Sequence, residues 1–159
     1  MSLGNEIVKI VEAIAPINTT GAAQAANHIS LKNYDHCTIV INTGAWAGGT
    51  AAVTVEQSTV VAGTDDKALA FSWMYTNATA PTTDTLTKTA VTANTFNLSV
   101  AASMYVIEIP AASLDTDNNF DCIELNTASP GANADLISAT YILWRGRYKA
   151  DVAPTSLTD

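Results

Sequence analysis

The chain is short of charged side chains. Of its 159 residues only 14% are charged, against roughly 25% in most soluble domains. Basic residues are fewer than acidic ones. The chain has 7 Lys and Arg and 15 Asp and Glu, which gives a formal net charge of -8. A general nucleic-acid-binding protein needs excess cations to displace counterions from phosphates, and an anionic membrane surface attracts polybasic segments. We therefore expect neither nucleic acid nor a membrane as a partner.

Long hydrophobic runs and grouped cysteines are also missing. No apolar run approaches the roughly 20 residues of a membrane-spanning helix. Residues 1–6 lack the basic and apolar segments of a signal peptide, so we expect synthesis in a cytoplasm. The two cysteines, Cys37 and Cys122, each lie in an apolar run. A reducing compartment would leave both as thiols, although a disulfide is possible if their strands face each other. With no clustered histidines they cannot form a common structural zinc site.

The usual signatures of catalysis are absent too. The two histidines, His28 and His36, stand beside polar residues at the starts of predicted strands, where a solvated or hydrogen-bonded side chain is ordinary. The sequence has no Gly-x-Ser-x-Gly, no phosphate-binding glycine loop and no His-Glu-x-x-His. Residues 115–119 match the opening of a calcium loop, but Phe120 and Asn126 replace its required Gly and Glu. We predict a solvated turn there, and no enzyme, cofactor or metal site.

What the sequence does contain is strand patterning. Residues 52–58, 67–75 and 95–100 alternate with a period of two, as half-buried antiparallel strands do. Residues 37–41, 105–109 and 136–144 are apolar on both faces, which is typical of central strands or of strands covered by a partner. Turn-forming residues separate these runs. The pattern predicts an all-β fold, an antiparallel β-sandwich or jelly roll. The predicted core consists of Ile39, Ile41, Val53, Val55, Leu69, Phe71, Trp73, Phe96, Leu98, Ile107, Ile123 and Leu143.

The two ends of the chain lack this patterning. We assign residues 1–26 to an N-terminal arm, 27–149 to the sandwich domain and 150–159 to a C-terminal tail. The arm contains apolar residues at helical spacing, but their β-branched side chains favour an extended segment equally. An apolar run on a flexible tether suits an arm that orders against a partner. The residues concerned are Ile7, Ile10, Val11 and Ile14.

The second candidate contact segment holds three of the 7 basic residues, interleaved with aromatic side chains. Arg, Trp and Tyr are the residues most enriched at the energetic centres of interfaces. Alternation in an extended segment would place the cations on one side and the aromatic rings on the other. An ordinary strand end with exposed charges would show the same pattern. The residues are Trp144, Arg145, Arg147, Tyr148 and Lys149.

Several segments together resemble a known family. Residues 11–16, 29–41, 65–71, 106–110 and 114–122 are similar, in the same order, to small virion proteins of tailed bacteriophages. The resemblance implies a structural protein of the phage particle, made in the host cytoplasm, without fixing its place in that particle. β-rich proteins of this size in phage heads are commonly trimeric decoration, or cement, proteins on the outer capsid, an analogy of fold and size.

The composition is consistent with such a role, although a biased genome would produce it as well. Small polar side chains cost less entropy to immobilise at a contact than long charged ones do. We expect a homo-oligomer, with a trimer favoured, that binds the major capsid protein or other virion proteins. A tail or neck component is the alternative within this class. A carbohydrate-binding, adhesin-like sandwich is the alternative outside it, with Trp46 as the one loop tryptophan.

Overall fold

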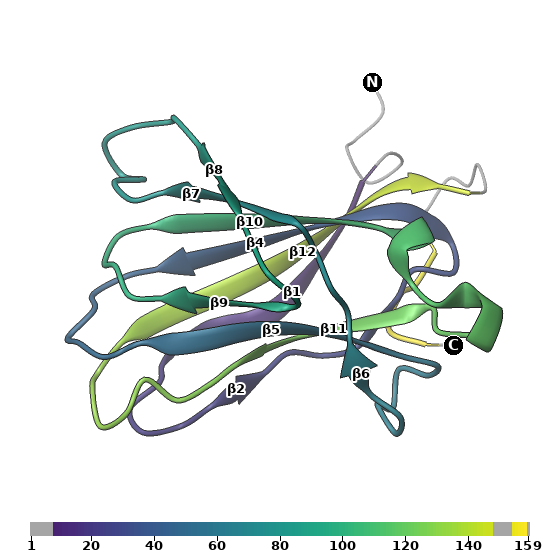
Figure 1. Cartoon of the computed structure of the whole chain (residues 1–159), viewed down its shortest axis with the longest axis horizontal. Coiled ribbons are helices and arrows are strands. Elements are labelled where there is room, and N and C mark those ends of the chain that lie inside the picture. Colours follow the sequence, from purple (N-terminus) through teal and green to yellow (C-terminus); the bar gives the residue numbers. More distant parts are fainter. Residues whose placement is uncertain (1–7, 148–153, 159) are drawn as a thin grey trace.

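Two antiparallel β-sheets stack face to face in the computed structural model of the chain, which describes residues 8–147 and 154–158 (Figure 1). The elements are β1 (Val8–Asn18), β2 (Gln24–Ala25), β3 (Ile29–Ser30), β4 (Tyr34–Thr43), β5 (Ala51–Ser58), β6 (Lys67–Ala68), β7 (Trp73–Asn77), β8 (Thr87–Ala90), β9 (Thr95–Leu98), β10 (Met104–Pro110), η2 (Ala111–Ser113), η3 (Thr116–Asn118), β11 (Cys122–Thr127) and β12 (Leu136–Gly146). The larger sheet has the order β1–β12–β4–β10–β7–β8. The smaller has β2–β11–β5–β6, with β3 paired to β11 and β9 to β5. The predicted all-β antiparallel sandwich is confirmed.

The centre of the larger sheet is formed by β12, β4 and β10, which lie next to one another. These strands contain the three runs that are apolar on both faces, so their assignment as central strands is confirmed. Ile39 of β4 stands opposite Ile107 of β10 on one side and Tyr141 of β12 on the other. All three side chains are completely buried between the sheets. Because these three side chains must all face the core, they determine how β12, β4 and β10 are aligned with one another.

The predicted core residues are buried, with the exception of Trp73. Phe71 and Phe96 meet edge to face at 6.2 Å between ring centroids, and Phe96 stacks on Tyr105 at 5.7 Å. Trp73 is 47% exposed because residues 67–75 do not form one strand. The chain leaves the smaller sheet after Ala68 and joins the larger one at Trp73, and the crossing reverses the alternation.

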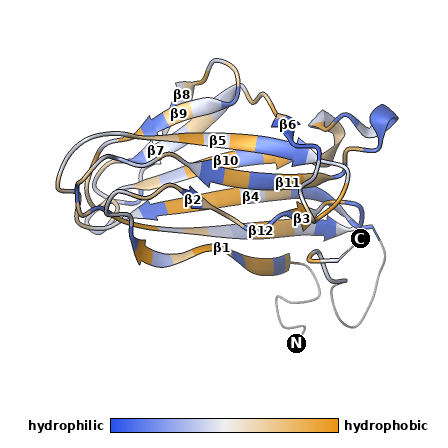
Figure 2. Ribbon diagram, turned by 90° about the horizontal axis from the view of Figure 1, so that it is seen from below, coloured by the Kyte–Doolittle hydropathy of each residue, from blue (hydrophilic) through white to orange (hydrophobic). Residues whose placement is uncertain are grey.

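The N-terminal segment is an edge strand over its described residues. β1 pairs antiparallel with β12 along its length, and Figure 2 shows it as the outermost strand of its sheet. The predicted arm is therefore wrong for residues 8–18, which belong to the sandwich. The register shifts between Glu12 and Ile14 and again before Ile17, and these irregularities with Pro16 interrupt the plain period of two. Ile7 lies outside the described residues.

The described part of the C-terminal tail packs on the domain. The carbonyl oxygen of Ser156 accepts a hydrogen bond from the Ser30 amide at 2.7 Å, and Ser156 is fully buried. The Tyr34 hydroxyl donates to the carbonyl oxygen of Pro154. Residues 154–158 form no strand, as a tail would, but Pro154 and Ser156 anchor them to the domain.

The turn predicted at residues 115–119 contains η3, which is one turn of 3₁₀ helix. The Asn118 side-chain amide donates to both carboxylate oxygens of Asp115 at 2.9 Å, and the Lys67 ammonium pairs with the same carboxylate. Hydrogen bonds from Lys67 and Asn118 lower the pKa of Asp115. In residues 8–147 and 154–158, no helix has the length and hydropathy needed to cross a membrane.

The two cysteines are buried thiols in opposite sheets. Cys37 lies in β4 of the larger sheet and Cys122 in β11 of the smaller one. Burial raises the pKa of the Cys37 thiol far above its usual value. A thiol held protonated in this way is a poor nucleophile, so Cys37 acts as a small core side chain.

Tyr141 connects the two sheets through the core. Its hydroxyl accepts a hydrogen bond of 2.8 Å from the Leu125 amide of β11, while the ring belongs to β12. Burial raises the pKa of Tyr141 well above its usual value, so the hydroxyl stays protonated.

Replacing this hydroxyl should therefore destabilise the protein. In Tyr141→Phe the Leu125 amide loses its acceptor, which costs about 1–3 kcal/mol for a buried polar group. Urea titration followed by circular dichroism would measure the loss. Tyr75→Phe, on the half-exposed outer face of the larger sheet, is the matched control and should change stability by less than about 0.5 kcal/mol. Equal midpoints for both variants would show that the Tyr141 bond contributes nothing.

Candidate interaction surface

The two predicted contact segments meet at one edge of the larger sheet. The N-terminal segment is β1 and the C-terminal cluster ends β12, and these strands are neighbours. Val8 stands opposite Trp144, and Ile10 stands opposite Ile142. Residues that are far apart in the sequence are thus brought side by side. Tyr148 and Lys149 lie outside the described residues.

Only part of the apolar N-terminal run is exposed at this edge. Ile10 is 66% exposed, whereas Val11 and Ile14 are buried in the core. Val11 faces inward by simple alternation, and the irregularity between Glu12 and Ile14 turns Ile14 inward as well. As core residues, Val11 and Ile14 do not offer surface to a partner. Ile10 does.

The C-terminal cluster departs from simple alternation at Arg145. This residue has a left-handed φ of 53° and is exposed. Beyond it, the Arg147 amide donates to the carbonyl oxygen of Asn33 at 2.8 Å, and the Arg147 Nε lies 3.4 Å from the Asp35 carboxylate. Arg147 is therefore paired with Asp35 of the same chain, whereas the exposed Arg145 is the cation of this cluster that a partner could contact.

Trp144 lies over the outer face of the sheet and is held there by polar contacts. Its indole Nε1 donates to the Thr38 hydroxyl at 2.9 Å, and Thr38 donates to Glu108 at 2.9 Å. The imidazole of His36 contacts the same Glu108 carboxylate. A cavity of about 440 Å³ is lined by His36, Glu108, Trp144 and Arg145. The indole is thus fixed in orientation while 41% of the residue stays exposed.

Apolar side chains continue from this edge across the outer face. Val40, Val106 and Tyr75 stand opposite one another on β4, β10 and β7. Trp73 follows at the far side, where the Lys88 ammonium sits 4.0 Å from its ring centroid. Monomeric proteins rarely leave extended apolar surface uncovered. We call this surface the apolar outer face, and it comprises Ile10, Val40, Trp73, Tyr75, Ile142 and Trp144, whereas Val106 is buried and offers no surface.

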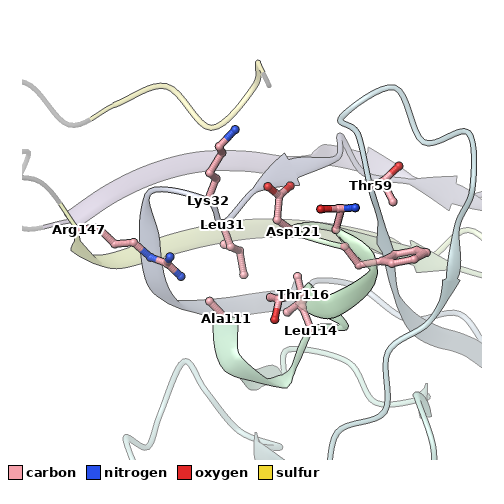
Figure 3. A pocket seen from close by; sticks show the side chains of 10 residues that line it. Leu31, Lys32, Thr59, Ala111, Leu114, Thr116, Asp121 and Arg147 are labelled. Atoms are coloured by element: carbon pink, nitrogen blue, oxygen red, sulfur yellow. The ribbon is translucent and has the colours of Figure 1, made fainter.

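A second cavity lies near the end of β12 and has a different character. Its volume is about 390 Å³, and Leu31, Ala111 and Leu114 form its apolar part. Figure 3 shows Arg147 at one side of it and Thr59 at the opposite side. This cavity contains polar and apolar groups in a mixture that does not select one ligand chemistry. The apolar outer face is the more distinctive feature.

Sequence reasoning identified Trp144 and Ile10 but missed Trp73 and the adjacency of the two segments. Trp73 was missed because a crossing between sheets reverses which side of a strand faces the core. That crossing has no sequence signature of its own.

No protein-family model and no curated protein sequence matches the chain. Among solved structures it is similar to the SPBc2 prophage-derived protein YomS, at 7% identity and a TM-score of 0.49 over 87% of this chain and 93% of that one. It is also similar to a pilus protein of Bacillus endospore appendages, at 14% identity and a TM-score of 0.40 over 91% and 95%. A chain of infectious bursal disease virus Gx strain matches at 12% identity and a TM-score of 0.42 over 92% and 34%. These similarities concern the arrangement of the strands.

Proposed function

We propose that the protein is a structural component of a bacteriophage particle, and specifically a decoration protein that binds neighbouring capsid subunits. The observation that carries the proposal is the apolar outer face, with Ile10, Trp73 and Trp144 all more than 40% exposed. A face of this kind loses unfavourable contact with water when a partner covers it. The family resemblance of the sequence supplies the phage particle as the setting.

The mechanism would be cohesion by many weak contacts. Burial of apolar area contributes roughly 25 cal/mol per Å² before the costs of association are subtracted. Repetition over a capsid lattice would add avidity, because a subunit held at one point rebinds at the next with a high effective concentration. Low surface charge limits both the entropy and the desolvation costs of covering the face.

Self-association belongs to the same proposal, with a trimer favoured. A trimer would cover part of the apolar outer face of each copy and leave the rest for the capsid. Light scattering on the purified chain would test this at increasing concentration. A mass that stays at the 16.6 kDa of one chain would contradict the self-association.

Carbohydrate binding is the second candidate, and the exposed tryptophans are the observation that favours it. Sugar recognition uses the open face of an aromatic ring. Lys88 lies over the ring of Trp73, however, and Trp144 is tied to the Thr38 hydroxyl. Trp46 is held by a hydrogen bond from its Nε1 to the carbonyl oxygen of Gly49. Rings that are covered or fixed in this way fit a protein contact better than they fit the stacking of a sugar on an open ring face.

Analysis of purified phage particles by quantitative mass spectrometry would test the proposal. A copy number comparable with that of the major capsid protein is the expected result for decoration. A far lower copy number would overturn decoration in favour of a tail or neck part. Absence from the particle would overturn the structural role altogether.

A further inference from the structure

Three potential metal-binding side chains converge on the smaller sheet, away from the apolar outer face. His28 lies between β2 and β3, Asp66 immediately precedes β6, and Glu124 is in β11. One ligand atom from each lies within 4.8 Å of the other two. In the described part of the chain, this is the group of such residues that comes close enough to share one ion.

The distances leave the imidazole facing two carboxylates at once. His28 Nε2 lies 2.8 Å from Asp66 Oδ1 and 3.6 Å from Glu124 Oε2. A single N–H at that nitrogen makes one good hydrogen bond, to Asp66. A metal ion at the same place would contact all three groups.

The cluster also holds more negative charge than its neighbours balance. Glu56 of β5 stands directly opposite Glu124, and the Asn126 side-chain amide donates to both, at 3.2 and 2.8 Å. Lys67, next to Asp66, is directed instead toward Asp115. Burial raises the pKa of Glu124, and the negative charges of Asp66 and Glu56 raise it as well. The hydrogen bond from Asn126 and the interaction with His28 lower it.

The surrounding backbone holds the imidazole in position. Gly63 has a left-handed φ of 60°, and a Cβ built on it would collide with the His28 ring. The loop between β5 and β6 therefore closes tightly on the ring, and its glycine is required for that approach. A ligand confined in this way loses little freedom when it binds an ion.

We propose that His28, Asp66 and Glu124 bind a divalent transition-metal ion of the zinc class. Imidazole nitrogen with carboxylate oxygens is a ligand set that zinc accepts, whereas calcium and magnesium prefer oxygen alone. Ligand atoms about 2.0–2.1 Å from a tetrahedral ion are about 3.3 Å apart. The separations of 2.8 and 3.6 Å from His28 Nε2 lie close to this value, whereas the two carboxylates, within 4.8 Å of each other, could have to move closer together.

The bound ion would connect the β2–β3 segment, the β5–β6 loop and β11. Its role would be structural, because binding to the folded chain alone raises stability by mass action. The apolar outer face lies on the other sheet, so the metal site and the proposed docking function can succeed or fail independently.

Calorimetric titration of the EDTA-treated, dialysed chain with zinc chloride tests this site. We expect one ion per chain and a melting temperature that rises with zinc concentration, with little response to calcium or magnesium. Glu124→Gln keeps the side-chain shape and should remain folded by circular dichroism. It should weaken zinc binding at least about ten-fold, as should His28→Gln.

His36→Gln is the matched control, because His36 also contacts a carboxylate, that of Glu108, on the larger sheet. It should bind zinc as the parent chain does. A parent chain without a zinc response would overturn the proposal. Zinc binding of parental strength in both His28→Gln and Glu124→Gln would also overturn it. So would a loss of zinc affinity in His36→Gln as large as in those two variants, or a response to calcium as large as the response to zinc.

Discussion

Phe71→Ala should lower the free energy of unfolding by about 3–5 kcal/mol, the usual cost of truncating a buried phenylalanine. Phe71 is 8% exposed and packs edge to face on Phe96, which in turn stacks on Tyr105. Truncation would leave a cavity between the sheets, at the place where the chain crosses from one to the other. A guanidinium titration followed by circular dichroism would measure the change.

Trp73→Ala provides the matched control for this prediction. The two aromatic residues are two positions apart, but Trp73 is 47% exposed on the opposite side of the chain. Its truncation removes the contact with Lys88 and part of a half-exposed ring but leaves no cavity between the sheets, so we expect a clearly smaller loss than for Phe71→Ala. Equal losses for the two variants would show that the crossing between Ala68 and Trp73 is wrongly placed.

The contrast between these residues also shows what the sequence can predict. Alternation identified the inward side chains of β5 and β9 correctly, because each stays in one sheet from end to end. It failed across residues 67–75, because a period of two is read as one strand even where the chain changes sheets. The rule concerns neighbours along the chain. It contains no information about which sheet a strand joins.

The prediction of an N-terminal arm was wrong for a related reason. Helical spacing of its apolar residues arises in β1 because register shifts interrupt the strand period, as the inward position of Ile14 shows. The metal-binding cluster had no sequence signature at all, because His28, Asp66 and Glu124 come from three distant segments. Composition and residue type nevertheless indicate Trp144 and Ile10 as contact candidates, although nothing in the sequence shows that their strands are neighbours.

Trp144→Ala should weaken association by at least about 2 kcal/mol, the scale of a central interface tryptophan. The indole is exposed and fixed by its bond to Thr38, and it lies on β12, the strand whose Ile142 stands opposite the exposed Ile10 of β1. A fixed aromatic ring loses little entropy on docking, so its contact area contributes efficiently. Ile10→Ser should act in the same direction. Both variants should keep the circular dichroism of the parent chain.

Leu157→Ala is the control for this experiment, because Leu157 is 49% exposed but lies in the C-terminal segment, outside the apolar outer face. Sedimentation of each variant with purified particles, and light scattering of each alone, would compare their association. We expect the Leu157 variant to behave as the parent does. If Trp144→Ala and Ile10→Ser also bound as the parent does, the edge formed by β1 and β12 would not be the contact surface. Weakened binding of the Leu157 variant alone would instead place the contact at the C-terminal segment.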